Sequence, residues 1–268
     1  MRIFVAGIRK LIRRPVTYVT LGLLVGLLAL IYLAVGATAR QAEAVDSGAG
    51  ALLLVTFPAA YTLLLSFILG LGGLFAMIFG AAVAGSEWTW GTLKAAVARG
   101  ESRSRYQLLS FAAMGVMVGI GLLLAFAIGV AVTFVAANLA QVPTTGVSDT
   151  KTLGTLPELL GRGWLALVES CALGFAIATV ARSQLAGIGV GIAFYFGEGF
   201  ASIFLPDIVK FGPFTSAGAV VATDSSAFGG GAAPVALAPD VALLVVTAWL
   251  IGALFVTALF TERAEISG

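Results

Sequence analysis

The stretch GSEWTWGTLKAAVARGESRSRYQLLSF, residues 85–111, decides how the chain folds. It joins two long apolar runs, yet it contains two tryptophans, a Gly-Thr-Leu-Lys motif and three arginines. A segment that merely linked two helices would not need these side chains. We therefore expect this connection to have a structure and a role of its own.

The composition around this stretch is that of a membrane protein. Of the 268 residues, 60% are apolar and 10% are charged, whereas soluble domains carry about 25% charged residues. Several uncharged apolar runs reach the roughly 18 residues that a membrane helix needs. We expect residues 1–268 to form one all-α integral membrane domain. The net charge of +2 gives no reason to expect a nucleic acid as partner.

The residue content also limits the chemistry of the chain. Histidine is absent and Cys171 is the single cysteine, which removes histidine-based acid–base catalysis and the usual zinc ligand sets. None of the four lysines follows a glycine, so the Gly-Lys-Ser/Thr phosphate loop is missing. We expect no catalytic, cofactor-binding or metal-binding residues in this chain, which is predicted not to be an enzyme.

Six membrane-spanning helices are predicted from the apolar runs. The spans are residues 17–35, 57–84, 106–137, 156–181, 185–205 and 241–260. The pattern Ser104-x-x-Gln107 resembles a capping box at the third start, and Thr155-x-x-Glu158, with Pro157 in the first turn, resembles one at the fourth. Residues 138–155 read as a plain turn region.

The distribution of basic residues predicts the orientation. Six spans place both termini on the same side, and eleven of the fifteen Lys and Arg residues lie on that side. They are Arg2, Arg9, Lys10, Arg13, Arg14, Lys94, Arg99, Arg103, Arg105, Arg182 and Arg263. The positive-inside rule then places both termini in the cytoplasm. We expect a multi-pass protein of the cell's inner (plasma) membrane, with the lipid bilayer as a partner.

Residues 1–14 predict an amphipathic helix on the inner leaflet. Phe4, Ile8 and Leu11 follow helical spacing on one face, while basic residues lie largely on another. A plain basic segment that orients the first span is the alternative. A cleaved signal peptide is disfavoured because the apolar run of residues 17–35 is longer than a usual signal core.

The connection between the second and third spans contains residues that predict its local structure. Trp88 and Trp90 suit the headgroup level of a bilayer, and Gly91 permits a sharp turn. Residues 92–98 can form two helical turns, which Arg99 and Gly100 end. The sequence predicts a short cytoplasmic helix held between two membrane helices, where it can receive force from a soluble partner.

These residues carry a resemblance to a known family. Glu87, Gly91-Thr92-Leu93-Lys94, Arg99-Gly100 and Ser102-Arg103, just before a new span, resemble the signature of type-2 ATP-binding-cassette (ABC) transporter permeases. The turn has Gly-Glu where the family commonly has proline. The resemblance covers the whole chain in layout, but this connection alone in motif.

The resemblance implies partners and roles. Two permease subunits would form a homo- or heterodimer, with the small-residue pairs Gly22/Gly26 and Gly115/Gly119 as candidate contact faces. Two cytoplasmic ATPase subunits, which bind ATP and magnesium, would dock on the short coupling helix. The residues carrying that contact would be Glu87, Thr89, Gly91, Thr92 and Lys94. The family also implies a partly re-entrant extracellular segment between the fifth and sixth spans. A lipid-anchored loop is the plainer alternative for the connection.

Two carboxylates lie within the predicted spans. A charge in the bilayer is costly unless it is paired, hydrated or protonated. Glu169 and Glu198, with Tyr195 and Arg162, are therefore candidates for the lining or outer gate of a translocation path. The structural alternative is that Arg162 neutralises Glu169, while Glu198 faces water or a packed seam.

The function that these observations favour is the permease subunit of an ABC exporter for a hydrophobic or amphipathic substrate. A separate ATPase would supply the energy. Two alternatives stay open: a non-transporting membrane partner, such as an immunity or assembly factor, and a proton-coupled secondary transporter. A membrane-embedded enzyme is disfavoured by the residue content.

Overall fold

Apolar runs that cross lipid must satisfy their backbone hydrogen bonds internally, and they therefore fold as helices. The computed structural model describes residues 2–42, 49–221 and 237–263, and it has no strand within those ranges. Six of its helices are long and apolar enough to cross a membrane. The predicted all-α class with six spans is confirmed in this respect.

The long helices extend the predicted spans at both ends. They are α2 (Pro15–Ala42), α4 (Ala59–Thr89), α6 (Arg103–Ala140), α7 (Thr150–Ala181), α8 (Gln184–Phe204) and α11 (Pro239–Arg263). The longest, α6, has 38 residues. At about 1.5 Å per residue it is roughly 57 Å long, well beyond the ~30 Å of a hydrocarbon core.

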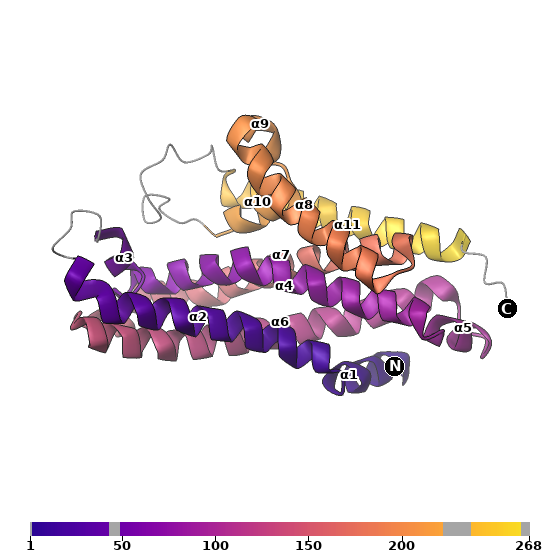
Figure 1. Ribbon diagram of the computed structural model, residues 1–268, viewed down its shortest axis with the longest axis horizontal. Helices are drawn as coiled ribbons and strands as arrows, with labels where there is room; N and C mark the ends of the chain where they lie inside the picture. The colour runs from indigo at the N-terminus through magenta and orange to yellow at the C-terminus, as the bar shows by residue number, and fades with distance from the viewer. Residues whose placement is uncertain (1, 43–48, 222–236, 264–268) are drawn as a thin grey trace.

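Short helices lie at the two ends of the bundle. They are α1 (Arg2–Ile12), α3 (Ala49–Leu53), α5 (Thr92–Val97), η1 (Thr145–Ser148), α9 (Pro206–Val209) and α10 (Pro213–Ala219). Figure 1 shows α1, α5 and the last turn of α11 at one end, here named the α5 end, and α3, α9 and α10 at the other, the α10 end. At the α5 end the backbone N–H of Ser104 donates to Glu262, 3.3 Å away, which joins α6 to α11.

The connection between the fifth and sixth spans, predicted as partly re-entrant, contains two short helices. The short helices α9 and α10 follow α8 directly, and α10 packs against α4, α7, α8 and α11. Pro206 and Pro213 begin the two helices, where their missing N–H groups cost nothing. Residues 222–236, the rest of this connection, lie outside the described ranges.

The centre of the bundle is the seam between α4 and α7. In the most apolar window of each helix, 56% of α4 and 72% of α7 is buried, against 17% for both α8 and α11. The seam is close because of two glycines: a Cβ at Gly80 would overlap the carbonyl of Cys171, and one at Gly174 would overlap that of Met77. In a membrane, small residues allow this close packing.

The two predicted small-residue pairs have different surroundings. Trp164 of α7 donates its indole N–H to the carbonyl of Gly115 at 2.9 Å, and its ring lies 3.0 Å from the Cβ position of Gly119. This pair therefore packs within the chain, against α7. Gly22 and Gly26 have no neighbour within 4 Å of their Cβ positions in the described structure.

Both predicted capping boxes are wrong. Helix α6 begins at Arg103 with Ser102 as its N-cap residue and no side-chain cap, so Ser104 already lies inside the helix and cannot cap it. Helix α7 begins at Thr150, where the carboxylate of Asp149 accepts the N–H of Thr152 at 2.9 Å. Hydrogen bonds from Thr152 hold the pKa of Asp149 below its ordinary value.

Residues 138–155, predicted as a turn region, are therefore mostly helical. Pro157 lies inside α7 rather than in its first turn. The helix tolerates it because Leu153, whose carbonyl loses its helical donor to Pro157, is exposed. No buried backbone group needs to remain unpaired there.

The predicted N-terminal helix is present as α1. Leu11 is buried, and Phe4 and Ile8 pack against the core, mainly beside α6. A Cβ added at Gly7 would lie 3.1 Å from the Cβ of Ala113, so α1 and α6 approach closely there. The apolar face of α1 thus contacts the bundle itself.

We expect Gly174→Ala to destabilise the protein because the new methyl group meets backbone, which cannot rotate away. Overpacking of this kind costs about 1–3 kcal/mol. Thermal unfolding in detergent should show a lower midpoint. Gly252→Ala, at an exposed helical site with no neighbour within 4 Å, is the matched control and should leave the midpoint unchanged. Equal midpoints for the two variants would contradict the close seam.

Candidate functional site

A buried carboxylate organises the α5 end. Glu87, in the last turn of α4, is fully buried. Lys10 of α1 and the hydroxyl of Thr92 in α5 both donate to its carboxylate, and the hydroxyl of Tyr106 in α6 donates at 2.9 Å. One side chain therefore joins α4, α5 and α6, which follow one another in the chain, to the N-terminal α1. We name Glu87 and these three donors the Glu87 cluster.

Arginine and tryptophan side chains surround the Glu87 cluster. Arg14 lies 3.7 Å from the Glu87 carboxylate and donates to the Ser86 hydroxyl at 2.7 Å. Its guanidinium lies 5.0 Å from the ring centre of Trp90. On the other side of α4, Arg182 lies 5.4 Å from the ring centre of Trp88. Trp88 and Trp90 thus each form a cation–π contact with an arginine of the same chain.

Burial affects both basic side chains beside Glu87. Loss of water lowers the pKa of Lys10, although the charge and hydrogen bond of Glu87 oppose that change. Burial likewise lowers the pKa of Arg14, and Glu87 again opposes it. A buried cation without its partner is energetically costly. Separating Lys10 of α1 from Glu87 of α4 would therefore destabilise the fold, and the pair holds the two helices together.

Helix α5 has one inward and one outward face. Leu93 and Ala96 are buried against the bundle, whereas Ala95 and Ala98 are exposed. Gly91 at φ +66° and Gly100 at φ +88° flank the helix. Both have left-handed backbone that glycine adopts without strain, which allows the chain to turn sharply into and out of α5.

The structure brings together part of the predicted set. Glu87 and Thr92 contact each other, while the Thr89 hydroxyl donates to its own helix at the carbonyl of Gly85, 3.1 Å away. Gly91 forms the predicted turn. The side chain of Lys94 lies outside the described part of the chain.

Sequence reasoning missed the partners of Glu87. The sequence predicts Lys10 and Arg14 only as cytoplasmic basic residues, and Tyr106 only as the start of the third span. One signal was available: Lys10 and Arg14 are four residues apart, so they can face the same side of a helical segment. Their target could not be found, because it lies 77 residues from Lys10.

A second carboxylate holds the α10 end together. Glu198 of α8 is buried and accepts the backbone N–H groups of Phe214 at 3.3 Å and Thr215 at 2.5 Å. These groups belong to the first turn of α10, where free N–H donors favour a negative charge. Tyr195, one turn earlier, donates to the carbonyl of Gly70 at 3.1 Å, and its ring packs on that of Phe214.

These side chains border a pocket. It has a volume of about 220 Å³ and lies between α4, α8 and α10, with Gly70, Tyr195, Glu198 and Thr215 among its walls. It is the more polar of the two pockets described in this chain. Two of the four predicted pathway residues, Tyr195 and Glu198, therefore meet at one place.

The expected pairing of Arg162 with Glu169 is wrong. Arg162 contacts Glu158 and Asp240 instead, both at 2.8 Å, and so joins α7 to the start of α11. Glu169 lies seven residues further, about 10 Å along the helix, and Arg162 turns to the closer acids at the α10 end.

Glu169 is left almost without polar partners. It is fully buried, and its Oε2 atom accepts only a long hydrogen bond of 3.4 Å from Ser170. Within the described residues its Oε1 atom has no hydrogen-bond partner. Within the same ranges no ion pair involves Glu169.

The geometry thus defines a helical multi-pass membrane protein with one buried charge cluster at each end of its bundle. Comparison with models of known protein families gave no match, and comparison with curated proteins gave none either. The functional argument therefore depends on the residues themselves.

We expect Glu87→Ala to release α1 and α5 from the bundle, because Lys10 and Thr92 lose their shared acceptor. A hydrogen bond to a charged group contributes about 1.5–3 kcal/mol, and 1.4 kcal/mol is a factor of ten. Amide hydrogen exchange in residues 4–12 and 92–97 should accelerate roughly tenfold or more.

The control is Glu101→Ala, a carboxylate of the same connection outside the Glu87 cluster. It should leave exchange in both segments unchanged, and exchange in the middle of α4 and α7 should be unchanged in both variants. Unaltered exchange of α1 in Glu87→Ala would contradict the role given to the cluster.

Proposed function

We propose that this chain is the permease subunit of an ABC transporter, an exporter of a hydrophobic or amphipathic substrate. The observation that carries this proposal is the Glu87 cluster, which fixes a short helix to the ends of three others. A connecting loop without mechanical work to do would not need a buried carboxylate with donors from three further helices.

The α5 end is the cytoplasmic end in this proposal, and the membrane is the plasma membrane. Eleven of the fifteen basic residues belong to segments on the α1 and α5 side, which is the arrangement that the positive-inside rule gives to cytoplasmic segments. Both termini are then cytoplasmic, and α9 and α10 lie on the outer side.

A separate ATPase subunit, which binds ATP and magnesium, contacts the outward face of α5. Ala95 and Ala98 are exposed there, and Lys94 and Gly91 belong to the same short segment. Glu87, whose carboxylate is buried, positions α5. Thr92 provides the contact, because its hydroxyl at the start of α5 donates to the Glu87 carboxylate. Force on α5 then reaches α4 through Glu87, α6 through Tyr106 and α1 through Lys10.

A second permease subunit completes the transporter in this proposal. Gly115 and Gly119 are occupied by Trp164 of the same chain, which leaves the open surface at Gly22 and Gly26 and the exposed face of α8 for that contact. Substrate would pass beside α8, and the α10 end, held by Glu198 and Tyr195, would close the exit.

Ala95→Trp should abolish binding of the ATPase, because the large ring occupies the docking face without touching the buried side of α5. The test is affinity purification of the tagged chain from its native cells, followed by assay of magnesium-dependent ATP hydrolysis in the eluate. Wild-type protein should elute with this activity, and Ala95→Trp should lose most of it at equal membrane level.

Ala238→Trp is the matched control, since Ala238 is exposed at the opposite end, just before α11. It should retain the ATPase. The proposal fails if no ATPase elutes with the wild-type chain, or if Ala95→Trp retains as much as the control.

Glu169 favours one other candidate function, a proton-coupled secondary transporter. A carboxyl buried within a span, with an oxygen that has no hydrogen-bond partner among the described residues, is a candidate proton site in a membrane protein. Under the permease proposal we expect vesicles holding this chain alone, with an imposed pH gradient, not to accumulate a lipophilic fluorescent cation. Accumulation that disappears in Glu169→Gln would favour the proton-coupled function instead.

A further inference from the structure

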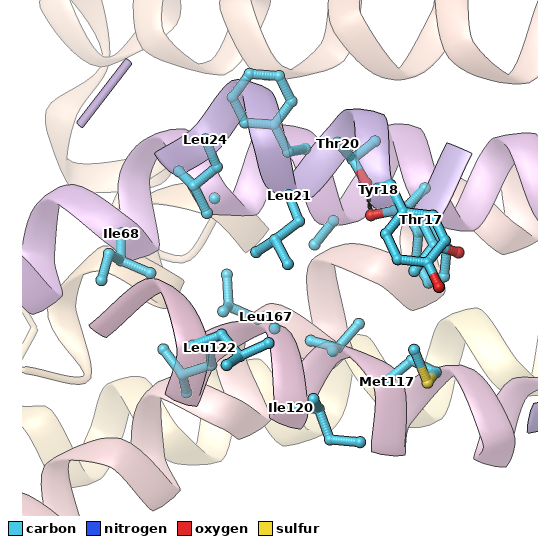
Figure 2. Close-up of a pocket in the computed structure, with 17 residues that line it drawn as sticks. Thr17, Tyr18, Thr20, Leu21, Leu24, Ile68, Met117, Ile120, Leu122 and Leu167 are labelled. Atoms are coloured by element: carbon cyan, nitrogen blue, oxygen red, sulfur yellow. Dashed lines mark hydrogen bonds between the residues drawn. The ribbon is translucent and has the colours of Figure 1, made fainter. Parts of the chain in front are cut away.

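An apolar pocket opens between three of the spanning helices, away from both charge clusters. It has a volume of about 240 Å³ and lies between α2, α4 and α6, with Leu167 of α7 at its back. Figure 2 shows Leu21, Leu24, Ile68 and Leu122 around it, with Thr17, Tyr18 and Thr20 gathered at one side. Its volume is below the roughly 300–1,000 Å³ of sites for drug-sized ligands, so it suits a slender occupant.

The hydroxyl groups in the walls of this pocket already donate hydrogen bonds within the protein. The three hydroxyls at its side all donate to backbone carbonyls: Thr17 to Leu11, Tyr18 to Ile12 and Thr20 to Val16, at 2.7–2.8 Å. The rest of the lining is almost wholly aliphatic or aromatic. A polar substrate would lose its hydration there without compensation, and the occupant must be apolar along its buried length.

The mouth of the pocket faces the lipid side of the bundle. Among its lining residues Tyr18 is 59% exposed, and Ile120 and Leu124 are each 46% exposed. All three belong to segments that cross the membrane. An acyl chain of the surrounding bilayer can therefore enter sideways, without passing through the protein.

A positive charge lies at one end of the pocket. The Tyr18 hydroxyl binds the carbonyl of Ile12, and the next residue, Arg13, is exposed. Arg9, also exposed, lies one helical turn earlier. Neither forms an ion pair within the described ranges, in contrast to Lys10 and Arg14 between them, which face Glu87. Free basic side chains beside a membrane helix attract anionic headgroups.

We propose that this pocket binds one acyl chain of an anionic phospholipid, whose net negative headgroup lies beside Arg13. The site joins α1 to α2, α4 and α6, since the headgroup contacts the turn between α1 and α2 while the chain fills the gap between the three spans. It does not depend on the proposed transport function.

The test is native mass spectrometry of the detergent-purified protein after addition of dioleoyl phosphatidylglycerol or dioleoyl phosphatidylcholine. Wild-type protein should retain one phosphatidylglycerol. Gly121→Leu fills the pocket from α6, where the Cβ position has its nearest neighbour at 3.9 Å, and Ala76→Leu fills it from α4. Both variants should lose the retained lipid with either headgroup.

Arg13→Glu tests the headgroup separately. It should lower phosphatidylglycerol retention roughly tenfold and leave phosphatidylcholine retention unchanged, and because Arg13 is exposed the protein should fold as the wild type does. Gly252→Leu and Arg99→Glu, at exposed sites away from the pocket, are the matched controls and should behave as wild type.

Three results would overturn the proposal. The first is that wild-type protein retains no phosphatidylglycerol beyond the control level of phosphatidylcholine. The second is retention of lipid by both filling variants. The third is loss of self-association, with lipid retention unchanged, in Gly121→Leu, since that result would assign the pocket to a second copy of the chain. If both filling variants prove unstable in thermal unfolding, the result for Arg13→Glu decides.

Discussion

The burial of one negative charge at the end of α4 is the constraint from which the arrangement of the α5 end follows. A carboxylate removed from water is tolerated only with cations and hydrogen-bond donors around it, and Glu87 obtains them from α1, α5 and α6. Each donor belongs to a different segment, so none of these helices can shift independently. The charge thereby makes one mechanical unit of four helices, in addition to the apolar contacts that α1 and α5 make with the bundle.

The opposite end uses the same principle with backbone donors. Glu198 receives N–H groups of α10, so a carboxylate on a spanning helix again fixes a short one. Between the two ends, the α4–α7 seam is apolar and very close, and its glycines leave no room for sliding. The middle of the bundle is thus closely packed. At both ends a buried carboxylate fixes helices that are too short to be stable alone.

The number of spans, the helical class and the turn at Gly91 followed from apolar run length and from the turn residue alone. The predictions that failed concerned side chains whose contacts come from segments distant in sequence. Arg162 was assigned to Glu169 because the two share a face of one helix, but Asp240, 78 residues away, provided a closer acid. Gly115 and Gly119 offered a surface that Trp164 fills. The contact between Glu198 and α10 was likewise beyond sequence reasoning, because nothing in the sequence shows that α10 packs against α8.

The length of α6 has a consequence for communication between the two faces of the membrane. Its first turns carry Tyr106 of the Glu87 cluster, and its last turns contribute Ala136 and Ala137 to a separate small core with Val55. A helix without a proline or a break along its 38 residues behaves as a stiff rod. A tilt of about 5° over its roughly 57 Å would displace the far tip sideways by about 5 Å, so a small rocking motion on one side of the bilayer becomes a movement of the helix end on the other.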